Sequence, residues 1–420
     1  MNPVSRPTLT LRIGLALLVA AVLAFIALQR QRPAAAQPIR IGVLHSLTGT
    51  MAVSEAPLVD AVRLAVEEIN AGGGLLGRPV EMLIADGRSD WAHFASEAER
   101  LIATEQVSAL FACWTSACRK AVKPVVEEHN HLMLYPVQYE GLEQSPNILY
   151  TGAAPNQQIV PGTRWALENF GKRVYLVGSD YIFPRTANRI IRDLITAQNG
   201  AVLAERYLPL GSTDVAEVLA DIQHWQPDVV LNTINGDSNA ALFAALQEAG
   251  LSDLPLVSFS VAEPEMAAWG GSRLSRHFGV WSYFQSLPRA ENQRFVHAFQ
   301  QRFGATRLTS DPIEAAYVGV HLWAQAVRDA GTIDPPRVNS VLLRQSISAP
   351  SAIISVDATT RHLWKMLRIG QVGSNGQFKE VMTSSAPLRP EPWPFYRTHE
   401  AWLELVGAAV PSAAPTGERP

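Results

Sequence analysis

The sequence predicts an α/β fold of two lobes, in which parallel sheets lie between helices and a hinge joins the lobes. From Pro38 onward, short β-branched runs alternate with amphipathic helical stretches, a rhythm typical of parallel sheets. A second series with the same rhythm begins near Gly171. The length of 420 residues exceeds one ordinary hydrophobic core. These three observations together favour two similar lobes.

The first series runs from Ile39 to about Tyr135. In its first helix, Val62 and Ile69 share one apolar face, and glycines 72–74 tolerate the left-handed backbone that ends a helix. The expected strands are 39–45, 80–85, 107–112 and 132–135, and the expected helices are 58–70, 91–103 and one that ends near 129.

The second series supplies strands and helices in the same alternation. The expected strands are 173–178, 201–208, 228–233 and 254–259, and the expected helices are 184–198, 215–223 and 239–249. Helical patterns at 294–303 and 312–330 indicate that the chain crosses back between the lobes. We expect a first lobe of 37–155 plus roughly 285–345, a second lobe of 156–284 plus roughly 346–386, and a Pro-rich tail of 387–420. About the last ten residues of that tail have the composition of a disordered segment.

Composition excludes a nucleic-acid binder. The formal net charge is −3, and acidic and basic residues are mixed along the chain, so no basic stripe is present to neutralise phosphates. A hydrophobic content of 47% with 17% charged residues is typical of a compact globular protein.

The N-terminus has the pattern of an export signal. Arg6 and Arg12 precede an apolar run at 13–28, and three alanines follow at 34–36, which predicts a secretory signal peptide cleaved near Gln37. An uncleaved membrane anchor is the alternative. The run of 16 apolar residues is slightly long for the apolar region of a signal peptide and slightly short for a helix that spans a bilayer. Both interpretations predict a periplasmic protein.

The only two cysteines, Cys113 and Cys118, lie five positions apart. An exported protein can form a disulfide, although the simpler interpretation is two small buried residues flanking a loop.

The loops that follow the expected strands supply the candidate binding site. Ligands of open parallel sheets bind beyond the carboxyl ends of the strands, so two lobes facing one another would hold a ligand between these loops. Several candidates have a plain structural alternative, such as a helix cap, a turn or a salt bridge. The candidate ligand-binding residues are Ser46, Thr48, Trp114, Ser116, Tyr135, Gln138, Tyr139, Tyr181, Phe183, Asn235, Asp237 and Glu263.

These loops are rich in aromatic, hydroxyl and amide groups and contain no Lys or Arg, except for later helix residues such as Arg119 and Arg185. A carboxylate or phosphate ligand usually needs a cation, so we expect a small neutral polar ligand. We expect no catalysis, cofactor or metal site, because no hydrolase, zinc or phosphate-loop motif is present. His93 and Glu97 have the spacing of a solvated helix face.

Eight segments resemble the periplasmic type I solute-binding proteins of the branched-chain amino acid class. The segments are IGVLHSLTGTMA (41–52), EEINAGGGLLGRP (67–79), CWTSACRKAVKPVVEE (113–128), YPVQYEG (135–141), SPNILYTGAAPNQQ (145–158), GSDYIFPRT (178–186), NTINGDSN (232–239) and DPIEAAYVGVHLWAQA (311–326). YPVQYEG followed by TGAAPNQQ is similar to the urea and short-chain amide branch. The resemblance implies two Rossmann-like lobes joined by three crossovers, with the ligand between them.

The resemblance also implies roles for individual residues. Trp114 and Ser116 match the aromatic residue and the hydroxyl residue of the family's first-lobe loop. Tyr135 matches a ring that lines the pocket, and Tyr181 matches a second-lobe aromatic that closes on the ligand. Phe183 stands where an amide-sensing relative has tyrosine.

Val137 and Gln138 stand where that relative has threonine and proline, which favours urea over aliphatic amides. The implied function is delivery of urea or a short amide to the permease subunits of an ABC importer. The alternative is a periplasmic or membrane-linked amide sensor that reports occupancy to a regulatory partner, because the tail at 389–402 resembles that of the amide-sensing relative. A general amino acid binder is disfavoured by the missing cation.

Overall fold

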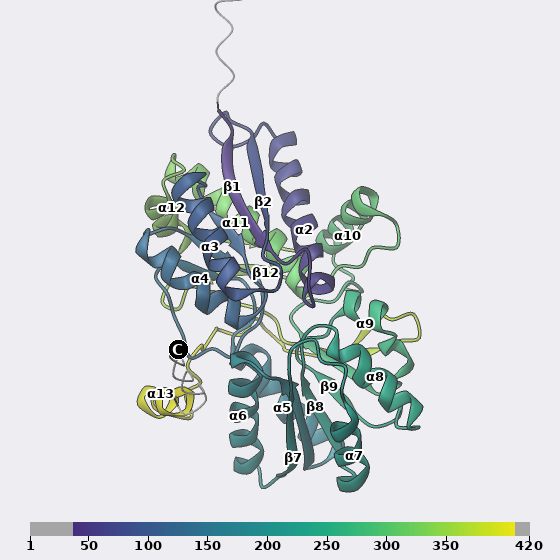
Figure 1. The fold of residues 1–420 in the computed structure, drawn as a ribbon. Helices are drawn as coiled ribbons and strands as arrows, with labels where there is room; N and C mark the ends of the chain where they lie inside the picture. Colours follow the sequence, from purple (N-terminus) through teal and green to yellow (C-terminus); the bar gives the residue numbers. More distant parts are fainter. Residues whose placement is uncertain (1–36, 408–420) are drawn as a thin grey trace, which may run out of the picture.

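A computed structural model describes residues 37–407 of the chain (Figure 1). The expected signal or anchor at 1–36 and the expected disordered end at 408–420 lie outside the described residues. No helix within 37–407 combines the length and the apolar character that crossing a bilayer requires.

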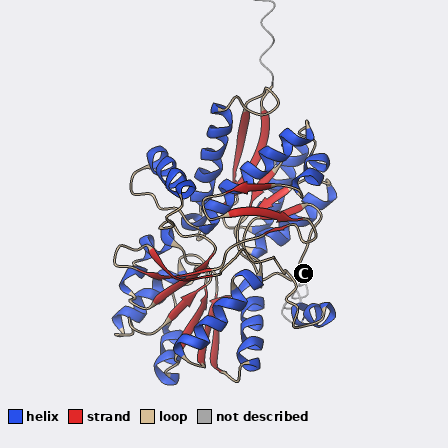
Figure 2. Cartoon of the chain, turned by 180° about the vertical axis from the view of Figure 1, so that it is seen from behind, coloured by secondary structure: helices blue, strands red, loops and turns tan. Residues whose placement is uncertain are grey.

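The described chain forms two sheets, each in its own lobe (Figures 1 and 2). The first sheet has the order β11-β12-β13-β5-β4-β3-β1-β2, and the second has the order β15-β14-β10-β9-β8-β6-β7. The strands of the first sheet are β1 (Ile39–His45), β2 (Val80–Asp86), β3 (Leu110–Ala112), β4 (Met133–Tyr135), β5 (Ile148–Tyr150), β11 (Ser346–Ser348), β12 (Ile353–Asp357) and β13 (His362–Leu363). Those of the second sheet are β6 (Arg173–Ser179), β7 (Ala201–Leu208), β8 (Val229–Thr233), β9 (Leu256–Ser258), β10 (His277–Trp281), β14 (Arg368–Val372) and β15 (Phe378–Thr383).

Helices cover both faces of each sheet, so the central strands are buried on both sides (Figure 2). In the first lobe, α2 (Ala52–Ala71) packs on α11 (Asp311–Ala330), and α3 (Trp91–Glu99) packs on α4 (Ser116–Glu128). In the second lobe, α5 (Ile159–Phe170) pairs with α6 (Ile182–Ala197), and α8 (Ser238–Glu248) contacts both α7 (Ala216–Trp225) and α9 (Glu263–Trp269). The remaining helices of the described chain are α10 (Ala290–Phe303), α12 (Pro335–Leu342) and α13 (His399–Gly407).

The two-lobe α/β architecture is confirmed, but the sheets are mixed and not wholly parallel. The pairs among β1–β5 and among β6–β10 are parallel, as expected. In contrast, β12 pairs antiparallel with β11 and β13, and β14 pairs antiparallel with β10 and β15. Short links explain the pairs β11–β12, β12–β13 and β14–β15, because a parallel partner requires a crossover of a dozen or more residues. The β10–β14 pair has a long link, and its direction follows from the passage of the chain back from the first lobe after β13.

Sheet membership shows where the chain passes between the lobes. It leaves the first sheet after β5, returns after β10 and leaves again after β13. The sequence placed 346–386 wholly in the second lobe, whereas β11, β12 and β13 belong to the first sheet. The last passage therefore lies between Leu363 and Arg368.

Candidate functional site

The two lobes contact one another through the loops at the carboxyl ends of their strands. The indole Nε1 of Trp114, after β3, donates to Oδ1 of Asn235, after β8, at 3.2 Å. The side-chain amide of Gln138, after β4, donates to the carbonyl of Phe259 at 2.8 Å, beyond β9. Both Trp114 and Asn235 are buried. The structure is therefore a closed form in which candidate residues of both lobes meet.

The loop 113–118 is held by a disulfide between Cys113 and Cys118, with 5.6 Å between their Cα atoms. Cys113 has a φ of 71°, and the Thr115 hydroxyl accepts from the backbone N–H of Cys118 as the cap of α4. The simpler sequence interpretation, two separate buried cysteines, was wrong. The backbone turns sharply after β3 and thereby brings the two residues within bonding range.

A cluster of buried charges lies beneath this loop, centred on Arg119. Its Nε donates to Glu143 at 2.8 Å, its Nη1 to the hydroxyl of Ser116 at 2.9 Å, and its Nη2 to Glu140 at 3.1 Å. Ser116 in turn donates to Glu140 at 2.5 Å. The Arg119 side chain is fully buried, so it stands between two carboxylates and a hydroxyl with no contact to solvent.

Two tyrosine rings enclose the guanidinium. The Arg119 Cζ lies 5.0 Å from the ring centre of Tyr135 and 4.5 Å from that of Tyr139. The Tyr135 hydroxyl donates to the carbonyl of Trp114 at 2.6 Å. Tyr135 therefore joins the charge cluster to the loop that contacts the second lobe.

The charges within this cluster shift one another's pKa values. Burial opposes ionisation of Glu143, but the positive charges of Arg119 and Lys120 outweigh burial and hold its pKa far below the ordinary value. Burial also opposes the charge of Arg119, but the two carboxylates raise its pKa well above normal. Arg119 and Glu143 are consequently ionised at neutral pH. The cluster pairs two basic side chains, Arg119 and Lys120, with two acidic ones, Glu140 and Glu143.

The second lobe contributes Tyr181, the residue that precedes α6. Burial raises the pKa of Tyr181 well above normal, and the next contributions come from Tyr135, Glu140 and Glu55 of the first lobe. The Tyr181 ring is half-buried and packs against the core of the second lobe. Asp237, half-buried at the start of α8, donates its backbone N–H to the hydroxyl of Thr50 at 3.4 Å.

Several candidates make contacts that give them a structural role. Thr48 is exposed and its hydroxyl donates to Asp86 at 2.8 Å, and Ser46 is buried and accepts from the backbone N–H of Ser89 at 3.0 Å. Phe183 packs in the core of the second lobe.

The Tyr139 hydroxyl and ring are both committed inside the first lobe. The hydroxyl lies 2.6 Å from Nε2 of His362 and donates to the carbonyl of Glu143, while its ring stacks on Tyr150. The ring and hydroxyl of Tyr139, which were expected to contact a ligand, instead contact residues of the paired strands β5 and β13.

Glu263 is fully buried at the start of α9, where its Oε1 accepts from the backbone N–H of Gln285 at 2.9 Å. Burial raises its pKa to about 8, with smaller contributions from Glu265 and Asp311, although backbone N–H groups oppose the rise. No salt bridge of Glu263 is present among the described residues.

We expect Glu263→Gln to stabilise the protein above neutral pH. A carboxyl with a raised pKa binds its proton more tightly in the folded state, so the free energy of unfolding falls as pH rises from about 4.5 towards 8, by about 1.4 kcal/mol per pKa unit. The amide keeps the bond to Gln285 without a charge. Thermal unfolding should give equal Tm values at pH 5 and a higher Tm for the variant at pH 8. Parallel Tm curves from pH 5 to pH 8 would contradict this assignment.

Glu140 and Glu143 were not among the candidates predicted from the sequence, and Arg119 was considered only as a helix residue outside the loops. Arg119 follows Ser116 by three residues on α4, so helical periodicity places both on one face. Glu140 and Glu143 lie further along the loop between β4 and β5.

A further missed pair is His45 at the end of β1 and Glu55 on α2, both fully buried, with 3.4 Å between Nδ1 and Oε2. The expectation that no cation stands near the cleft was wrong, because Arg119 is there.

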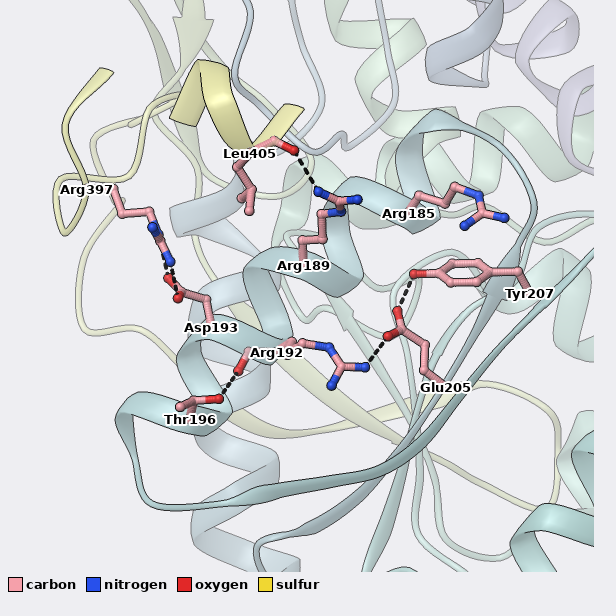
Figure 3. Close-up of a pocket in the computed structure, with 9 residues that line it drawn as sticks. All are labelled: Arg185, Arg189, Arg192, Asp193, Thr196, Glu205, Tyr207, Arg397 and Leu405. Carbon is pink, nitrogen blue, oxygen red and sulfur yellow. Dashed lines mark hydrogen bonds and ion pairs between the residues drawn. The ribbon is translucent and has the colours of Figure 1, made fainter. Parts of the chain in front are cut away.

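A groove of about 560 Å³ lies away from the lobe interface, along α6, β7 and α13 (Figure 3). Its arginines face acidic partners: Arg192 pairs with Glu205, and Arg397 pairs with Asp193. The groove is therefore a surface network of satisfied ion pairs. Among residues 37–407, no group of three or more His, Cys, Asp or Glu side chains is placed to hold a metal ion.

We expect removal of the disulfide to weaken ligand binding more than folding. A loop this short constrains the unfolded chain little, about 2 kcal/mol, whereas its residues Trp114 and Ser116 lie at the interface. Cys113→Ser with Cys118→Ser should therefore raise the ligand Kd severalfold and lower Tm by a few degrees, as checked by calorimetry and thermal unfolding. An unchanged Kd would show that the loop keeps its shape without the bond.

Comparisons with known proteins agree with this architecture. A family model described as a periplasmic binding protein domain matches residues 39–399. Leu/Ile/Val-binding protein homolog 6 of Brucella melitensis biotype 1 is 22% identical over 361 residues, which cover 83% of this chain and 92% of that protein. A limonene hydroxylase of Geobacillus stearothermophilus is 29% identical over 123 residues, and the match covers 29% of this chain and only 22% of that enzyme.

Solved structures share the fold at low identity. A solute-binding protein of an ABC transporter from R. palustris, in complex with 4-hydroxybenzoate, has a TM-score of 0.76 at 23% identity and covers 86% of this chain and 99% of its own. The branched-chain amino acid transporter substrate-binding protein LivJ from Streptococcus pneumoniae, in complex with isoleucine, has a TM-score of 0.73 at 19% identity. The match covers 84% of this chain and 100% of that one. The family match spans both lobes and the interface between them, so the chain belongs to the family of periplasmic binding protein domains.

Proposed function

We propose that the protein binds urea or a short-chain amide between its lobes in the periplasm and delivers it to the permease of an ABC importer. The observation that carries the choice of ligand is the full burial of Arg119, each of whose nitrogens already has an acceptor within the first lobe. Its Nε, Nη1 and Nη2 already donate to Glu143, Ser116 and Glu140. A ligand carboxylate would need two of these nitrogens for the usual bidentate pairing.

The surrounding charges also favour a neutral ligand. A carboxylate placed beside Glu140 and Glu143 would be repelled by both, and the compensating charges of Arg119 and Lys120 are already paired. An amide instead offers N–H groups, which carboxylates accept, and a carbonyl, which hydroxyl and indole donors bind. The Glu55 Oε1 atom is buried without a hydrogen-bond partner, and so it is available as an acceptor.

The aromatic residues fit the size and polarity of such a ligand. In the proposed site, the buried rings of Trp114 and Tyr135 and the half-buried ring of Tyr181 supply flat walls, while the polar groups orient the ligand. Closure then follows from contacts that the ligand makes with both lobes at once.

A thermal-shift screen of the mature chain tests the proposal. The panel comprises urea, formamide, acetamide, butyramide, isoleucine, benzoate and 4-hydroxybenzoate, of which the last three carry a carboxylate. We expect Tm to rise with urea or one of the amides, because a ligand bound only by the folded state stabilises it. A rise with isoleucine or a benzoate alone would overturn the neutral-ligand proposal.

A further inference from the structure

The chain after β15 forms a segment that touches both lobes, which we call the C-terminal strap (residues 387–407). It follows the last strand of the second sheet, runs past the first lobe and ends as α13 beside α6 (Figure 1). The matched family model ends at residue 399, so most of α13 lies beyond it.

The first part of the strap is bound to the first lobe and to the passage between the lobes. Arg389 pairs with Asp357 of β12, with 3.1 Å between Nε and Oδ2. The carbonyl of Pro392 accepts from the backbone N–H of Leu142 at 2.8 Å. Leu142 lies between Glu140 and Glu143, the carboxylates that hold Arg119.

Close packing at Gly141 confirms that the strap supports this carboxylate loop. Gly141 has a φ of +69°, and a Cβ at this position would lie 2.3 Å from the carbonyl oxygen of Pro392. Any side chain here would push the strap away from the loop.

The second part of the strap is bound to α6 of the second lobe (Figure 3). Arg397 pairs with Asp193 through Nε at 2.8 Å and also through Nη2. Leu405 offers its carbonyl to Nη1 of Arg189 at 2.9 Å. Trp402 is fully buried in the second-lobe core, and its Nε1 donates to the carbonyl of Pro394 at 2.8 Å. The helix thus anchored, α6, starts next to Tyr181.

We propose that the strap is a positioning element of the binding site, which ties the carboxylate loop of the first lobe to α6 of the second and stabilises the closed form. Its two anchors, Pro392 and Arg397, are five residues apart, a span of at most about 18 Å. A segment fixed at both ends resists any motion that separates α6 from the carboxylate loop. The strap acts through Glu140 and Tyr181 and does not touch the ligand itself. The effect of the strap on closure is independent of the proposed function, on which only the identity of the ligand rests.

Paired variants test this coupling. Arg397→Ala removes one of the bonds that hold the strap to α6, and Asp193→Ala removes the same bond from the other side. Arg206→Ala is the matched control, since Arg206 pairs with Asp221 in the same lobe and away from the strap. Spin labels at Ala71→Cys and Asp253→Cys, exposed positions of the two lobes, report lobe separation in the ligand-free protein.

We expect both strap variants to shift the label distances towards longer values, with the double variant no different from either single one. The Kd for urea or acetamide, whichever gives the larger thermal shift, should rise about two- to fivefold in the strap variants and stay unchanged in Arg206→Ala. If Arg397→Ala gives the same distribution of label-to-label distances as Arg206→Ala, the proposal is overturned, whatever the distances themselves are. Because the distances are measured without ligand, this outcome is independent of whether the ligand is an amide.

Discussion

Replacing Arg119 with methionine should lower the free energy of unfolding by about 3–5 kcal/mol, the usual cost of breaking a buried ion pair from one side. The substitution leaves Glu140 and Glu143 buried without their shared partner, and Lys120 still pairs with Glu143. It also removes the Nη1–H group of Arg119 that donates to the Ser116 hydroxyl. Guanidinium chloride unfolding measures the change, and it avoids urea, which is a proposed ligand.

A compensated variant separates charge from packing. Arg119→Met combined with Glu140→Gln and Glu143→Gln has no uncompensated charge, so it should recover most of the lost stability. If the triple variant is as unstable as the single one, the loss comes from the packing of the guanidinium between Tyr135 and Tyr139.

The alternation of strands and helices predicted most of the fold, because buried parallel strands and amphipathic helices have distinct periods. β1 and β7 have the bounds that the sequence predicts, and α11 differs by one residue at its start. The antiparallel strands at the sheet edges were not predicted. β11 and β13 have only three and two residues, too few to show alternation, and their partners are fixed by tertiary contacts.

Contacts between the candidate residues were predictable where a residue follows a strand directly, and less so where they depend on a helix face or a distant partner. Trp114 bonds to Asn235 across the interface and Tyr135 bonds to Trp114, because parallel strands end at one edge. Tyr139 follows its strand equally closely, yet its ring turns inward to His362, which is 223 residues away. No local pattern reports a partner at that separation.

Trp114→Ala should weaken binding of urea or a short amide at least tenfold and leave Tm of the ligand-free protein within a few degrees. The indole bonds to Asn235 of the second lobe and, in the proposed site, also contacts the ligand, so we expect its removal to cost both ligand contact and closure. Aromatic walls are typically among the strongest contributors to a binding surface. Isothermal titration calorimetry with urea and acetamide gives the Kd, and thermal unfolding gives Tm.

Two further variants divide the effect between the ring and the bond across the lobes. Trp114→Phe keeps an aromatic wall but cannot donate to Asn235, and Asn235→Ala keeps the indole but removes its acceptor. If the bond acts in closure, both should raise Kd by a similar, smaller factor, and together they should do no more than either alone. The remaining loss in Trp114→Ala then belongs to the ring itself. An unchanged Kd in Trp114→Ala, with the fold intact, would place the ligand away from this indole and contradict the proposed site.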